Sequence, residues 1–154
     1  MFATLDPTSR RLRFPREREV IVTDTVGFIR DLPRDLVVAF RATLEEISEA
    51  SLLLHVVDAS AADLERRIEA VREVLDEIDD GRTPELLVFN QIDRLPPGVG
   101  KSIAARHGGA AVSALERTGL EDLLARADAI LWEEAEDAFE NGRRRPLALA
   151  AQGG

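Results

Sequence analysis

The chain of 154 residues has no cysteine, which excludes disulfide bonds, thiol catalysis, zinc–thiolate sites and iron–sulfur clusters. It also lacks any apolar run close to the roughly 18 residues that a membrane-spanning helix needs. The N-terminus has no charged segment followed by an apolar one, as a secretory signal has. We therefore expect a cytoplasmic protein without a membrane span.

Lysine is nearly absent as well, since only Lys101 is a lysine among the 20 basic residues. The net charge of −9 speaks against a general DNA- or RNA-coating protein, and we expect no DNA partner. With 45% hydrophobic and 32% charged residues, the chain has the composition of a folded globular domain. The length suits one domain, and we expect a monomer.

Apolar stretches of strand type alternate along the chain with stretches of helix type. The strand-type runs are Glu19–Thr25, Ser51–Asp58, Glu85–Asn90 and, more weakly, Gly109–Ser113. Apolar residues recur at helical spacing over Arg34–Ala50, Leu64–Ile78 and Leu120–Leu131. This alternation predicts a three-layer α/β fold, with a mostly parallel sheet and helices on both faces. In such a sheet a ligand binds at the carboxyl ends of the strands.

Polar residues follow three of these runs. After the first come Asp24, Thr25, Val26 and Gly27, where the acid can hold Mg²⁺ and the glycine lets a backbone N–H approach a phosphate. This pattern is common, and taken alone it is better explained by an aspartate that caps a turn before Gly27. After the third run come Asn90, Gln91, Ile92 and Asp93, and after the fourth Ser113, Ala114 and Leu115. The Asp93 carboxylate can accept both N–H groups that guanine offers and adenine does not.

The order of these motifs is that of a translational-type GTPase domain, and the sequence resembles the HflX family of the Obg–HflX GTPase superfamily. Three stretches carry the resemblance: Phe2–Thr8 (FATLDPT), Asp24–Pro33 (DTVGFIRDLP) and Ala39–Glu46 (AFRATLEE). Leu52–Ser60 (LLLHVVDAS) adds to it, and the resemblance covers about Phe2–Leu131. It implies a P-loop GTPase-type fold that binds and hydrolyses GTP with Mg²⁺, and a ribosomal partner, the large subunit in particular.

The resemblance also implies roles for single residues. Thr4 and Asp24 would hold Mg²⁺, and the Gly27 N–H would meet the γ-phosphate. The implied nucleotide-binding residues are Phe2, Ala3, Thr4, Leu5, Asp6, Asp24, Thr25, Val26, Gly27, Asn90, Gln91, Ile92, Asp93, Ser113, Ala114 and Leu115. No catalytic residue is assigned, because Phe28 stands where many GTPases have a water-positioning glutamine. We therefore expect slow hydrolysis that needs a partner.

Two departures from the family pattern matter. Gln91 replaces the usual lysine, which should weaken nucleotide affinity. The phosphate-binding loop G-x-x-x-x-G-K-[ST] does not occur in the 154 residues. We expect residues 1–139 to form a GTPase domain truncated at its N-terminus, inactive alone, and 140–154 to be a flexible tail. The strand before that loop would also be missing, which leaves two hydrophobic strand edges that must close together or aggregate. The alternative is a non-catalytic remnant or interaction module that docks on the ribosome.

Three other features have two readings each. Leu95–Ser102 (LPPGVGKS) is similar to an ATPase phosphate loop, but Leu95 occupies the required glycine position, so we expect a turn and a short helix. His55 lies inside an apolar run, where a buried structural histidine is favoured over a catalytic one. Five arginines between Arg10 and Arg18 could contact RNA phosphate or lie on a solvated hairpin, in which Arg11–Phe14 pairs with the first strand.

Overall fold

The structure is a computed structural model, which describes residues 8–14, 18–24, 47–79, 81–138 and 147–151. In chain order the elements are β1 (Thr8–Phe14), β2 (Arg18–Asp24), β3 (Leu52–Asp58), α3 (Leu64–Asp79), β4 (Glu85–Asn90), a 3₁₀ helix (Ile92–Arg94), α4 (Val99–His107), β5 (Ala110–Ala111), α5 (Leu120–Ala138) and β6 (Leu147–Ala151). No helix within the described ranges is long and apolar enough to cross a membrane.

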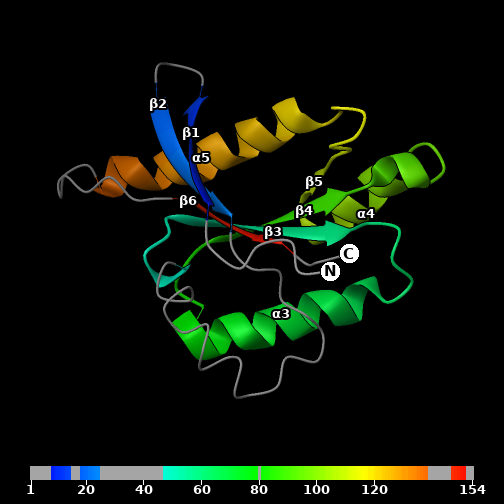
Figure 1. The fold of residues 1–154 in the computed structure, drawn as a ribbon, viewed down its shortest axis with the longest axis horizontal. Coiled ribbons are helices and arrows are strands. Elements are labelled where there is room, and N and C mark those ends of the chain that lie inside the picture. The colour runs from blue at the N-terminus through cyan, green and yellow to red at the C-terminus, as the bar shows by residue number, and fades with distance from the viewer. Residues whose placement is uncertain (1–7, 15–17, 25–46, 80, 139–146, 152–154) are drawn as a thin grey trace.

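One sheet of six strands, in the order β1-β2-β6-β3-β4-β5, forms the middle layer (Figure 1). Only the β1–β2 pair is antiparallel, and the other four pairings are parallel. Helix α5 covers one face and α3 the other (Figure 1). The predicted three-layer α/β fold with a mostly parallel sheet is confirmed, and so is the pairing of Arg11–Phe14 with the first predicted strand.

Among the described residues, two apolar clusters lie on opposite faces of the sheet, because successive strand side chains point to opposite faces. Leu52 and Leu54 of β3 pack with Val88 and with Ala127 of α5. On the opposite face, buried residues of β3, β4, α3 and α4 form the second cluster: Val57, Ala59, Leu64, Ile68, Leu87, Phe89 and Ala104. Each fully buried large side chain contributes roughly 1.5–3 kcal/mol, so the sheet is fixed from both sides.

Strand β6 is the main difference from the sequence-based expectation. It lies between β2 and β3 and runs parallel to both, with Leu149 paired to Asp24 on one side and to Leu54 on the other. The prediction of a flexible tail is therefore wrong for Leu147–Ala151, and the rest of 140–154 lies outside the described residues. The two inner strand edges do not close on each other. A third strand satisfies their backbone groups, which would otherwise cost free energy in the middle of the sheet.

Other predictions have different outcomes. The helix expected over Leu64–Ile78 is present as α3, and the short helix after the Pro-Gly turn is present as α4. The helix expected over Arg34–Ala50 lies outside the described residues except for its last four positions, of which Ile47 and Ala50 are buried. The division of the chain at residue 139 stays a prediction.

Candidate nucleotide-binding site

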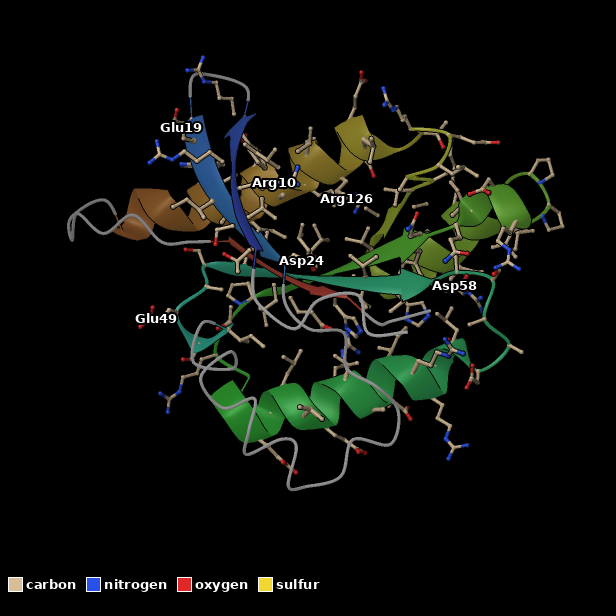
Figure 2. The ribbon with its side chains drawn as sticks, viewed as in Figure 1. Arg10, Glu19, Asp24, Glu49, Asp58 and Arg126 are labelled. Atoms are coloured by element: carbon tan, nitrogen blue, oxygen red, sulfur yellow. The ribbon has the colours of Figure 1, made fainter. Side chains whose placement is uncertain are left out.

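The polar strand ends lie toward one edge of the sheet because β2, β3, β4 and β6 run in the same direction. Asp58 at the end of β3 is level with Asn90 at the end of β4. Asp24, at the end of β2, is level with Leu54 of β3. Leu54 precedes Asp58 by four residues, so Asp24 and Asp58 are offset by about 13 Å along the strand direction. Figure 2 shows this separation of Asp24 and Asp58 along the sheet.

Asn90 joins the two loops that the sequence singled out for guanine. Its Oδ1 accepts hydrogen bonds from the backbone N–H groups of Gln91, at 2.8 Å, and of Ala114, at 3.0 Å. The start of the loop after β5 is bonded to β4, because the Val112 N–H donates to the Phe89 carbonyl at 2.8 Å. Asn90 thus does what the sequence predicted, and it holds the Asp93 loop and the Ala114 loop together.

Asp93 is oriented by Ser113. The Ser113 hydroxyl donates to Asp93 Oδ1 at 2.6 Å and accepts from the Glu116 N–H at 3.1 Å. Ser113 is fully buried whereas Asp93 is exposed, so a buried group aims a carboxylate at solvent. Holding one carboxylate oxygen in this way fixes the plane in which the other can accept hydrogen bonds. A carboxylate oriented in this way can accept hydrogen bonds from two neighbouring donors.

The loop after β5 makes a tight turn that requires glycine at position 119. Ser113 and Thr118 exchange two backbone hydrogen bonds, of 3.0 and 3.1 Å. Gly119 follows with φ of +75°, and a Cβ there would collide with the carbonyl oxygen of Ala111. The turn leaves Leu115 with 85% of its surface exposed, although Leu115 was predicted to line the base site.

Gln91 has a backbone conformation and a side-chain contact that the sequence did not predict. It has left-handed backbone angles, with φ of 65°, and its Oε1 accepts a hydrogen bond from Arg94 Nη1 at 3.1 Å. The same guanidinium lies 3.9 Å from the Asp58 carboxylate. Asp58 Oδ1 also accepts from the Ser60 hydroxyl and N–H, at 2.6 and 2.8 Å. Asp58 and Arg94 therefore belong to the group of polar residues next to Gln91 at the carboxyl ends of the strands. In the sequence, only the position of Asp58 at the end of a strand indicates that it belongs there.

The phosphate and metal half of the predicted site is only partly described. Phe2, Ala3, Thr4, Leu5, Asp6, Thr25, Val26 and Gly27 lie outside the described residues, as does Phe28. Of the two predicted Mg²⁺ ligands the structure therefore places only Asp24, half-buried at the end of β2. The described ranges hold no cluster of three or more acidic or histidine side chains suited to a metal. An oxygen donor at a strand end still fits Mg²⁺, which usually takes few protein ligands besides phosphates and water.

Lys101 does not serve a phosphate loop in this geometry. It lies in the first turn of α4, after Gly98, and its side chain is exposed. Gly100 is needed for packing, because a Cβ there would collide with the Ile92 side chain. A cavity of about 280 Å³ is lined by Lys101, Asp93, Glu116 and Thr118, among others, and so it adjoins the base loops. The expected turn and helix are confirmed.

His55 lies in the middle of β3 and contacts Glu85 at the start of β4, away from the carboxyl ends of the strands. The ring is fully buried, and its Nδ1 lies 2.5 Å from Glu85 Oε1. The second oxygen of Glu85 accepts from Arg72 Nε at 2.9 Å. Burial raises the pKa of Glu85, but the hydrogen bonds and charges of His55 and Arg72 outweigh it, so the pKa lies below its ordinary value of 4.5. A buried structural histidine was the favoured expectation.

Solved GTPase structures share this fold. One is Era in complex with MgGDPNP and a segment of 16S ribosomal RNA, with a TM-score of 0.62 and 21% identity over 82% of this chain and 44% of that one. Another is an Aquifex aeolicus Era variant bound to GDP·AlF4⁻, with a TM-score of 0.60 and 22% identity over 80% of this chain and 44% of that one. The fold is therefore that of the P-loop GTPases.

Sequence relatives narrow this class. Residues 1–91 match the family described as 50S ribosome-binding GTPase. The chain is 46% identical over 139 residues to the GTPase HflX of Caldanaerobacter subterraneus, which covers 88% of this chain and 31% of the relative. It is 56% identical over 95 residues to the GTPase HflX of Escherichia coli, or 62% of this chain and 22% of the relative. The chain belongs to the HflX family of GTPases, and it spans about a third or less of these relatives' length.

Proposed function

We propose that these residues form the guanine-binding portion of an HflX-type GTPase that acts on the large ribosomal subunit. The observation that carries the proposal is the pair of side-chain bridges between the two loops, Asn90 to Ala114 and Asp93 to Ser113. They place an oriented carboxylate and a backbone amide on one edge of the sheet. The family membership supplies the reaction class, which is GTP hydrolysis.

Guanine recognition follows from donor and acceptor positions. The Asp93 carboxylate accepts the ring N–H and the exocyclic amine of guanine, whereas adenine presents an acceptor at the ring position and repels the carboxylate. The Ala114 N–H is suited to guanine O6, but it already donates to Asn90 at 3.0 Å. Binding of O6 there therefore requires this N–H to be shared between two acceptors. The preference of the base site for guanine over adenine therefore comes mainly from Asp93.

Mg²⁺ bound with the nucleotide would be held by Asp24 and Thr4, and it would neutralise charge on the phosphate oxygens. Since Phe28 has no group that can orient water, hydrolysis by this family member is slow until a ribosomal partner assists it. These 154 residues contain no phosphate-binding loop. Taken alone they therefore bind GTP weakly, through the base more than through the phosphates.

The test is an NMR titration of the isotope-labelled chain, because chemical shifts detect millimolar affinities. We expect guanosine to shift the amide signals of Ala114 and Asp93, and adenosine at the same concentration to leave them in place. Asp93→Asn should lose guanosine and gain xanthosine, whose carbonyl at the amine position matches the new amide donor. Equal shifts with guanosine and adenosine, or no change of base preference in Asp93→Asn, would overturn the proposed function.

One observation favours a second function, nucleotide-independent docking. Strand β6 completes the sheet with this chain's own residues, so the fold does not depend on a phosphate loop or its ligand. An interaction module could then bind the large subunit in any nucleotide state. Cosedimentation with 50S subunits distinguishes the two. Binding that increases with a non-hydrolysable GTP analogue supports the GTPase portion, and binding that is the same with GTP analogue, GDP or no nucleotide supports the module.

A further inference from the structure

Strand β1 presents three arginines at the free edge of the sheet. Arg10, Arg11 and Arg13, which we call the arginine edge, are all exposed, and the Arg13 side chain keeps 80% of its surface open to solvent. β1 is an outer strand of the sheet, and among the described strands it pairs with β2 alone. Figure 2 shows Arg10 on this strand and Glu19 near the far end of the hairpin.

These arginines are poorly neutralised within the described part of the chain. The Arg13–Glu19 pair is long, at 3.8 Å, and lies in solvent on both sides, so it contributes little. Neither Arg10 nor Arg11 forms an ion pair with a described acidic residue. Residues 10–19 hold five arginines and two glutamates, in a chain whose net charge is −9. Residues 10–19 therefore carry a net charge of +3 (five arginines minus two glutamates) in a chain that is acidic as a whole.

Arg18, in contrast to the arginine edge, contacts helix α5 and so has a structural role. Its guanidinium lies 4.7 Å from the centre of the Trp132 ring and 3.7 Å from Asp128 of α5. Together with buried Phe14, which contacts Trp132 at 5.6 Å between ring centres, it fastens the hairpin to α5. For the arginine edge the structure shows no such contact with a described residue of α5. These arginines lie on β1, a strand that Phe14 packs against α5.

The strand geometry arranges this charge for a linear partner. Arg11 and Arg13 are opposite Ile21 and Glu19, so they share one face and lie about 6.7 Å apart along the strand. Arg10 projects from the other face, so charges flank the edge on both sides. A guanidinium binds a phosphate with two parallel hydrogen bonds, and a series of phosphates repeats at regular intervals along a nucleic-acid strand.

We propose that the arginine edge binds the sugar–phosphate backbone of RNA. This rests on the proposed association with the ribosome, which supplies the RNA, and it assigns the contact to a surface away from the base site. The competing explanation is that charge on an outer strand only prevents sheets from pairing edge to edge. Acidic side chains would serve that purpose equally well, so reversing the charge separates the two explanations.

The experiment compares the 154-residue chain with Arg11→Glu/Arg13→Glu. The matched control is Arg66→Glu/Arg106→Glu, two exposed arginines of α3 and α4 for which the structure shows no ion pair with a described residue. Binding to a fluorescein-labelled RNA duplex of 20 base pairs is measured by anisotropy against KCl concentration, and 50S binding by cosedimentation. We expect the edge variant to bind the duplex at least tenfold more weakly, with a slope of log K against log[salt] reduced by about 2. The control should lose less than threefold.

Three outcomes would overturn the proposal: duplex and 50S binding both unchanged in the edge variant, equal losses in the edge and control variants, or lost 50S binding with unchanged duplex binding. The last outcome would assign the edge to an acidic ribosomal protein. Circular dichroism checks that the variants fold, and Arg11→Gln/Arg13→Gln replaces the edge variant if it does not. The guanosine titration is independent of this hairpin. Its failure would remove the proposed base site, whereas failure of the RNA measurement would remove only the arginine edge.

Discussion

Asn90 Oδ1 accepts a hydrogen bond of 3.0 Å from the backbone N–H of Ala114, 24 residues further along the chain. The bond joins the end of β4 to the loop after β5, and it is the link on which the geometry of the candidate base site depends. Because the same oxygen also accepts from the Gln91 N–H, one side chain satisfies two loop amides. Removing it should therefore change both loops at once.

The first prediction concerns Asn90→Ala. Two backbone donors lose their acceptor, so we expect the free energy of unfolding to fall by about 1–3 kcal/mol. The guanosine-induced shifts should also require a severalfold higher ligand concentration. Urea unfolding and the NMR titration measure the two effects. Gln91→Ala is the matched control: it removes only a hydrogen bond to exposed Arg94 and should change stability by less than about 0.5 kcal/mol. A control variant as unstable as Asn90→Ala would contradict the assigned role.

The second prediction concerns Ser113→Ala, which removes the hydroxyl that orients Asp93 at 2.6 Å. Ser113 is fully buried and its oxygen also accepts from the Glu116 N–H. We expect a loss of about 1–3 kcal/mol of stability and weaker discrimination between guanosine and adenosine. Ser102→Ala is the control, since that exposed hydroxyl donates to the carbonyl of Gly98, the residue just before α4. Unchanged discrimination in Ser113→Ala would show that Asp93 needs no orienting partner.

The sequence singled out the two loops that Asn90 joins in the structure, but it did not indicate the strand at the centre of the sheet. Asn90 ends the buried strand β4 and Asp93 follows three residues later, so the motif and the strand pattern indicate the same place. The left-handed angle of Gln91 has no such signal, because only glycine announces that backbone region reliably. Leu147–Ala151 consists of leucine and alanine, with no β-branched residue to indicate a strand. Its position is decided by the unpaired edges of β2 and β3, which are distant in sequence.

The third prediction concerns pH. The pKa of Glu85 lies below its ordinary value of 4.5, because the favourable effects of His55 and Arg72 exceed the opposing effect of burial. A lowered carboxyl pKa contributes stability that is present above pH 4.5 and is lost as the pH falls through the folded-state pKa. We therefore expect the stability difference between the chain and Glu85→Gln to be largest above pH 5 and to shrink toward pH 3. Urea unfolding at several pH values measures it.

The control for the pH prediction is Glu65→Gln, which removes a carboxylate 3.0 Å from His107 at the surface. With 67% of the Glu65 side chain exposed, solvent screens that pair, and its removal should change stability by less than about 1 kcal/mol across the same range. A Glu85→Gln variant whose stability difference grows as the pH falls would reverse the sign, and it would contradict the assigned balance of burial and pairing.

The fourth prediction tests β6 as the strand that closes the sheet. Leu149 is paired with Asp24 of β2 and Leu54 of β3, and proline at this position removes its backbone donor from the ladder. Leu149→Pro should lower the free energy of unfolding by about 1–3 kcal/mol for that lost hydrogen bond, and by more if the whole strand detaches. The freed edges of β2 and β3 should then promote association, which size-exclusion chromatography detects. Leu149→Val keeps the N–H and favours a strand, so it should remain folded and elute unchanged. A proline variant as stable and as monodisperse as the valine variant would show that β6 does not hold the two halves of the sheet together.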